Sequence, residues 1–168
     1  MRRLNKEELD YFDRIKRCVR EILRNNKLLY FADFKFRVIR YDRYSPQGSP
    51  EGFFGVDEKG KSYIGIKNKV IIKSYEDYCL AKKFGDKYDL EVITTEMKRL
   101  LFHEVGHYLV HNYKIDVDNI ELPIEGKTKY AYVSKEEDFA EGFADYMIKN
   151  GYTIERNKYI EEILARYN

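Results

Sequence analysis

The residues best suited to chemistry lie close together. All three histidines of the 168-residue chain fall within nine positions, at His103, His107 and His111. The first two belong to an H-E-x-x-H sequence, HEVGH. On a helix, residues four apart are separated by only ~40° around the axis and ~6 Å along it, so both imidazoles can reach one metal ion. Glu104 lies beside them, where it can accept a proton from a metal-activated water instead of binding the metal.

A catalytic zinc ion usually has three protein ligands and a water, so the pattern requires a third ligand. His111 continues the four-residue spacing. However, it lies another ~6 Å along the axis and ~40° further round, and a straight helix does not bring three such residues onto one ion. We therefore interpret His111 as a residue at the helix end or behind the ligands.

Two carboxylates on a later segment are better candidates for the third ligand. Glu137 and Glu141 are four apart on one face of a helix predicted to begin at Ser134. One could bind the metal while the other holds a ligand imidazole in the required tautomer. Ser134 and Glu137 also have the spacing of a capping box, and the alternative is that Glu137 only caps its helix. Spacing alone does not choose between the two glutamates.

The helix that carries HEVGH must present its histidines to solvent or substrate while its other side is buried. Leu101, Val105, Tyr108 and Leu109 form an apolar stripe opposite the histidines. Gly106 lies in the middle of this helix, where glycine costs about 1 kcal/mol relative to alanine. We expect that Gly106 permits the close approach of another segment.

The two motifs together resemble a known class of enzymes. HEVGH followed by YAYVSKEEDFAEGFADYM (130–147) is similar to the gluzincin zinc metallopeptidases, and most similar to their lethal-factor-like and Pro-Pro endopeptidase branch. The resemblance covers about residues 103–147. It implies a zincin-like fold and Glu137 as the third zinc ligand. It implies further that Glu141 contacts a ligand histidine, His103 or His107, and does not bind the zinc itself. It also implies that Tyr130, seven residues before Glu137, stabilises the oxyanion of the transition state, with Tyr132 as a rival for this role.

Two other resemblances lead to different expectations. HEVGHYLVH also resembles the regulatory metallopeptidases of phage-repressor and radiation-response systems, but that group prefers Asn where Glu141 stands. EGFA resembles the aminopeptidase gluzincins, which would make Glu141 the ligand. That alignment loses the tyrosine spacing and the upstream glutamate, so we rank it lower.

The remaining pattern predicts an α+β fold with strands before helices and one domain over 1–168. We expect a small mixed or antiparallel sheet, the active-site helix and a C-terminal helix carrying the glutamates. Asn5 and Glu8 have capping-box spacing at the start of a basic amphipathic helix. The predicted helices span about 5–29, 74–85, 90–112, 134–151 with Gly151 at the C-cap, and 154–166. The predicted strands span 34–41, a hairpin within 52–68, and 70–74.

Composition excludes several classes of protein. Two cysteines are too few for a disulfide framework, and no stretch approaches the ~20 apolar residues of a membrane span. The charged N-terminus lacks a signal-peptide segment, so we expect a cytoplasmic protein without a membrane partner. Residues 1–40 carry twelve Lys or Arg against six Asp or Glu. We interpret this excess as the solvated face of a helix, and nucleic acid as an unlikely partner.

The sequence therefore predicts a zinc-dependent endopeptidase that acts on a protein or peptide substrate. Zn²⁺ lowers the pKa of its water and Glu104 acts as general base. We expect the strand at 62–67 to lie at the sheet edge and to pair with the extended substrate. The alternatives are a zinc-binding regulatory or toxin-like protein with one narrow protein target, and a basic binding protein without catalysis.

Overall fold

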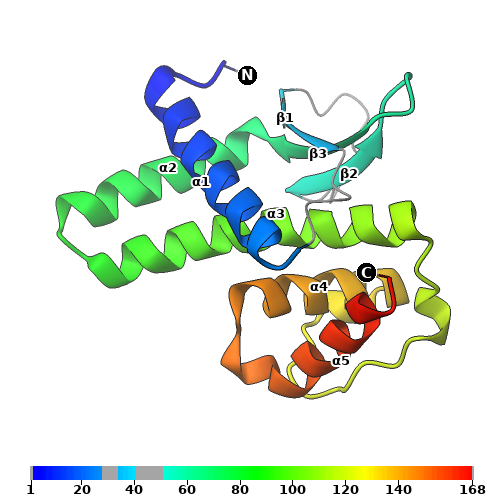
Figure 1. Cartoon of the computed structure of the whole chain (residues 1–168). Coiled ribbons are helices and arrows are strands. Elements are labelled where there is room, and N and C mark those ends of the chain that lie inside the picture. The colour runs from blue at the N-terminus through cyan, green and yellow to red at the C-terminus, as the bar shows by residue number, and fades with distance from the viewer. Residues whose placement is uncertain (1, 28–33, 41–50, 168) are drawn as a thin grey trace. The chain divides into compact units, whose positions relative to one another are not determined.

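A computed structural model describes residues 2–27, 34–40 and 51–167 (Figure 1). The fold is α+β, with five α-helices and a three-stranded mixed sheet in the described part of the chain. The chain forms two compact units, residues 1–101 and 102–168, and the division falls within helix α3 (Lys87–Tyr113). None of the helices in the described ranges is long and apolar enough to cross a lipid bilayer.

The first unit begins with helix α1 (Lys6–Asn25). The predicted capping box is confirmed, because the Asn5 side chain accepts from the Glu8 amide and the Glu8 carboxylate accepts from the Asn5 amide. The apolar stripe of the helix is buried at Phe12, Ile15 and Val19, among others. The helix ends at Asn25, with Asn26 as its C-cap, and so stops short of the predicted end near residue 29.

The sheet of the first unit is mixed. Strand β2 (Gly52–Val56) pairs antiparallel with β3 (Ser62–Lys67), as the predicted hairpin requires. Gly60 closes the turn with a φ of 73°, a conformation that glycine adopts readily. Strand β1 (Phe34–Ile39) pairs in parallel with the other side of β3. It corresponds to the strand predicted at 34–41, of which residue 41 lies outside the described residues.

The strand order β1-β3-β2 contradicts our expectation for residues 62–67. These residues form β3, the central strand, whose Ile64 and Ile66 are fully buried. The backbone groups of β3 are used by two neighbouring strands, so β3 cannot also pair with a substrate as an edge strand. The hairpin pattern revealed only the β2 side, because a parallel neighbour joined through a long connection leaves no local turn signal.

Residues 70–74 do not form the predicted strand. They lie within helix α2 (Asn68–Lys83), which begins directly after β3, six residues before the expected start at Ser74. The run Val70-Ile71-Ile72 has a high propensity for strands, but propensity is weaker than packing. Ile71 is fully buried and Ser74 Oγ lies 2.7 Å from the Tyr11 hydroxyl of α1, so the helical spacing buries this run on one side.

The second unit contains the end of α3 and the helices α4 (Lys135–Ile148) and α5 (Ile154–Ala165). Its buried centre is formed by Phe139, Phe143, Ala140 and Ile160. The short turns η2 (Val117–Asn119), η3 (Tyr130–Tyr132) and η4 (Gly151–Thr153) interrupt the segments between the helices. Helix α4 ends earlier than predicted, because Lys149, with φ 57°, forms the left-handed cap instead of Gly151.

Candidate metal centre

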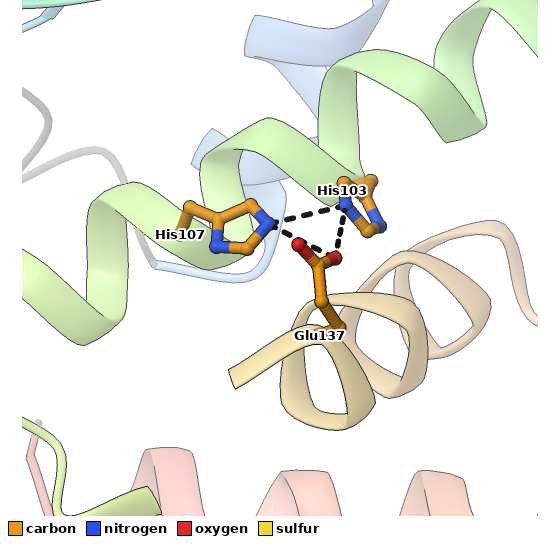
Figure 2. Close-up of side chains that lie close together, drawn as sticks. All are labelled: His103, His107 and Glu137. Atoms are coloured by element: carbon orange, nitrogen blue, oxygen red, sulfur yellow. Dashed lines mark hydrogen bonds and ion pairs between the residues drawn. The ribbon is translucent and has the colours of Figure 1, made fainter. Parts of the chain in front are cut away.

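Three side chains of the second unit converge on one point (Figure 2). His103 Nε2 and His107 Nε2 lie 3.2 Å apart. Oε2 of Glu137 lies 3.1 Å from the first nitrogen and 3.3 Å from the second. The structure thus brings the two histidines of HEVGH together with one of the two candidate glutamates, and these three atoms could hold a metal ion.

Local structure explains how Glu137 reaches the histidines. The Ser134 hydroxyl accepts a hydrogen bond from the Glu137 amide at 3.1 Å, which caps the start of α4. The reciprocal half of a capping box would need the Glu137 carboxylate to turn back to the Ser134 amide. Instead, the carboxylate points across to α3 (Figure 2). The backbone of Glu137 therefore serves the cap, and its side chain serves the cluster.

A carboxylate also lies at the other ring nitrogen of each histidine. Glu141 Oε1 is 2.8 Å from His103 Nδ1, although its direction departs from that of a regular hydrogen bond. Glu136 Oε1 is 2.7 Å from His107 Nδ1 and forms a hydrogen bond with it. Such contacts leave Nε2 of each ring to bind a metal and make the ring a stronger ligand.

Glu136 is a residue of the cluster that was not predicted from the sequence. Only the density of carboxylates at the start of α4 pointed to it, since Glu136 itself has neither the four-residue spacing nor a place in the motif. It reaches His107 because it occupies the first turn of α4, next to Glu137. Its side chain is 46% exposed, so it lies at the margin of the cluster.

The segment before α4 is attached to the cluster through Glu141. Thr128 Oγ1 donates to Glu141 Oε2 at 2.8 Å and accepts from the Ala131 amide at 3.2 Å. One hydroxyl therefore joins the turn η3 to the carboxylate that faces His103. Nζ of Lys127 lies 3.1 Å from Oδ2 of Asp138 on α4, and this ion pair attaches the same segment to α4 at a second point.

The structure distinguishes the two candidate tyrosines. The Tyr130 ring centroid lies 5.7 Å from that of His103. Burial, followed by the negative charge of Glu137, raises the pKa of the Tyr130 hydroxyl and keeps it protonated. Tyr132 is 63% exposed and its ring lies 4.3 Å from the Lys127 amine. Tyr130 is therefore the tyrosine that lies beside the cluster.

Glu104 and His111 have different surroundings. Glu104 is almost fully buried, and its negative charge helps to raise the pKa values of both His103 and His107. His111 is exposed and does not belong to the group of converging ligand atoms. The reason is the uninterrupted course of α3 to Tyr113, which carries His111 one further turn away from His107.

The charges of the cluster are strongly coupled. Burial lowers the pKa of His103, but Glu137 and Glu141 outweigh this effect and raise it to about 9. Burial likewise opposes ionisation of Glu137, but the two histidines hold its pKa at about 2. In the metal-free protein at neutral pH, a protonated His103 therefore faces an ionised Glu137.

The donor set fits a metal ion. Within the described part of the chain, Glu137 Oε2 is buried without a regular hydrogen-bond partner. A buried carboxylate oxygen normally has such a partner, because leaving it unpaired costs free energy. A cation held between this oxygen and the two Nε2 atoms would satisfy it. Two imidazoles and a carboxylate are ligands that suit several divalent transition metals.

Comparison of the chain with models of known protein families, with curated proteins and with solved structures finds no match.

Proposed function

We propose that this chain is a zinc-dependent endopeptidase of the gluzincin class with a zincin-like fold, and that His103, His107 and Glu137 bind the zinc ion. The observation that carries the proposal is the convergence of one oxygen and two nitrogens at 3.1 to 3.3 Å. Ligand atoms placed tetrahedrally at zinc distances of about 2.0–2.1 Å would be about 3.3 Å apart. The spacing therefore supports a four-coordinate zinc with one position left for water or substrate.

The protein residues would divide the chemistry of peptide hydrolysis. When bound, zinc supplies Lewis acidity, which lowers the pKa of a water and polarises the scissile carbonyl. Glu104 would accept the proton of the attacking water and then deliver it to the leaving amine. The Tyr130 hydroxyl, which is protonated at neutral pH, would donate a hydrogen bond to the developing oxyanion.

The carboxylates around the two histidines support this assignment of roles. Glu141 and Glu136 would hold the rings so that Nε2 of each faces the zinc ion. Glu104 is next in sequence to His103 but is absent from the group of converging ligand atoms. Its charge acts on both imidazoles, and we therefore assign it the role of base and not that of a ligand.

The test compares two glutamate-to-glutamine substitutions on the same helix. We expect the purified protein to contain one zinc per chain and to cleave a library of quenched fluorescent peptides. Glu104→Gln should keep its zinc and lose activity by about a hundredfold or more, the size of a general-base contribution. The control Glu96→Gln changes an exposed carboxylate of α3 two turns earlier and should leave both unchanged.

Two results would contradict the proposal. Protein that binds no zinc even after incubation with excess zinc would exclude the metal centre. A Glu104→Gln variant that cleaves peptides as fast as the unchanged protein would exclude Glu104 as the general base.

A further inference from the structure

We propose that a pocket between α1 and β1, in the first unit, binds a ligand with two or more linked phosphate groups. The pocket has a volume of about 450 Å³. We call it the α1–β1 pocket; its lining residues are Asp13, Lys16, Arg17, Arg20, Lys35 and Phe36. The proposal is independent of peptide hydrolysis, because it uses none of the residues of the metal centre.

The charge of the α1–β1 pocket is strongly unbalanced. Of the six lining residues in the described part of the chain, four are cationic and one, Asp13, is anionic. Asp13 already forms an ion pair with Lys16 at 2.5 Å. The remaining cations repel one another, which costs free energy in the empty pocket. An anionic ligand removes this cost on binding and gains attraction to the same groups.

Arg20 distinguishes this pocket from an ordinary basic helix face. Its guanidinium carbon lies 5.2 Å from the Phe34 ring centroid and 5.0 Å from that of Phe36. One nitrogen, Nη2, donates to the Phe34 carbonyl at 3.2 Å. Arg20 is half-buried, so the cation is less hydrated than on an open surface and its pKa is lowered.

Among the described residues, no carboxylate forms an ion pair with Arg20. Its one hydrogen bond to a described residue is the one to the Phe34 carbonyl. The two aromatic rings and this hydrogen bond restrict the guanidinium, and its other N–H donors form no hydrogen bond with the described residues. A guanidinium held in this way is preorganised to bind an oxyanion through two parallel hydrogen bonds.

The arrangement of cations favours linked phosphates. Arg17 and Arg20 are three residues apart, about 4.5 Å along α1, and neither is paired with Asp13 through its carboxylate. Lys35 enters from β1, on another element. A diphosphate or triphosphate carries several negative charges along a short chain and can reach more than one of these cations. A single carboxylate carries one charge and cannot.

The first experiment is calorimetric titration of the full-length protein with pyrophosphate and with ATP. We expect both to bind, and the affinity to fall as salt is raised, because the contacts are ionic. Triglutamate is titrated as a carboxylate of similar charge and should bind more weakly than pyrophosphate. Tighter binding of ATP than of pyrophosphate would show that the nucleoside also contacts the protein.

The matched variants remove one cation each. Arg20→Met keeps an apolar stem against the two phenylalanine rings, and Lys35→Met changes an exposed side chain that the fold does not need. We expect Arg20→Met to weaken pyrophosphate binding about tenfold or more, the effect of losing a charge-assisted hydrogen bond. Lys35→Met should weaken it measurably, and it tests the pocket even if Arg20→Met fails to fold. The control Arg24→Met removes the same charge from exposed α1 surface outside the pocket and should bind almost normally.

None of these substitutions changes the metal centre. Any pyrophosphate that binds at the metal centre therefore binds equally to all the variants. The proposal is overturned if neither pyrophosphate nor ATP binds the unchanged protein. It is also overturned if Arg24→Met weakens binding as much as the pocket variants do, since the attraction would then be diffuse. Triglutamate binding as tightly as pyrophosphate would assign the pocket to acidic peptides and exclude the phosphate assignment.

Discussion

Gly106 on α3 and Ala140 on α4 lie in direct backbone contact. A Cβ atom placed on Gly106 would stand 2.8 Å from the Cα atom of Ala140 and 3.2 Å from its Cβ atom. This confirms that the mid-helix glycine permits close approach of another segment. The contact lies between the helix that carries His107 and the helix that carries Glu137, so it limits how far apart the proposed metal ligands lie.

We predict that Gly106→Ala destabilises the protein and weakens its metal binding. The added methyl group meets backbone, and such overpacking costs about 1–3 kcal/mol, against a gain in helix propensity of up to about 1 kcal/mol. The free energy of unfolding is measured in urea, and the zinc affinity by chelator competition. Gly151→Ala is the control, because a Cβ there meets no atom within 4 Å. A Gly106→Ala variant as stable as the unchanged protein would show that the helices can move apart freely.

The parts of the site that could be predicted are those set by local geometry. The spacing of His103 and His107 on a helix places both rings on one side, whatever the rest of the fold. Ser134 marks the start of α4 because its side chain caps the helix locally. Glu137 could not be separated from Glu141 by spacing, since both lie on the same face. Only the packing of α4 against α3 decides which carboxylate reaches the Nε2 atoms.

The errors arose where distant segments decide the structure. The Val70-Ile71-Ile72 run favours a strand by propensity, but burial of Ile71 selects the helix α2. The central position of β3 depends on its pairing with β1, which lies more than twenty residues earlier. The strand β1 was predicted, but no local signal indicates that it pairs with β3. The contact of Glu136 with His107 likewise depends on how α4 meets α3.

We predict that Thr128→Val weakens zinc binding and perturbs the site at His103. The substitution keeps the shape of the side chain but removes the hydroxyl that donates to Glu141 Oε2. Loss of a group that contacts a ligand histidine directly costs 10–100-fold in metal affinity, so Thr128→Val, one contact further out, should cost less than Glu141→Ala. Chelator competition measures the affinity, and the visible spectrum of the cobalt-substituted protein reports changes in the ligand field.

Thr128→Ser keeps the hydroxyl and should restore both the affinity and the spectrum. The control Thr94→Val removes a threonine hydroxyl that bonds only to backbone carbonyls of its own helix, and it should leave both unchanged. If Thr128→Ser is as impaired as Thr128→Val, the methyl group of Thr128 matters and not its hydrogen bond.

We predict a graded response when the carboxylates of α4 are removed. Glu137→Ala should abolish stoichiometric zinc binding, because a ligand is lost. Glu141→Ala should retain zinc with an affinity reduced 10–100-fold. Glu136→Ala should have the smallest effect, because its carboxylate is half exposed and water can replace it at His107. Metal analysis after dialysis distinguishes these cases. Normal zinc content in Glu137→Ala together with none in Glu141→Ala would reverse the assignment of ligand.

We predict that the cluster's contribution to the stability of the metal-free protein is largest between about pH 4.5 and 6.5. The pKa of His103 rises from 6.5 to about 9 on folding, so its stabilising contribution is complete below pH 6.5 and is lost as the pH rises through 9. The pKa of Glu137 falls from 4.5 to about 2, so its contribution is complete above pH 4.5 and is lost as the pH falls through 2. Both shifts describe the same ion pair, which is counted once.

The measurement is urea unfolding in the presence of a chelator at a series of pH values, for the unchanged protein and for Glu137→Gln. Other titrating groups contribute equally to both proteins, so the difference between the two curves isolates the cluster. This difference should be largest near pH 5 to 6 and should shrink toward pH 9. Saturating zinc should reverse the alkaline trend, because zinc and protons compete for the imidazoles and a higher pH favours zinc. A difference that grows between pH 6.5 and 9 in the metal-free protein would show that His103 is not held protonated by Glu137.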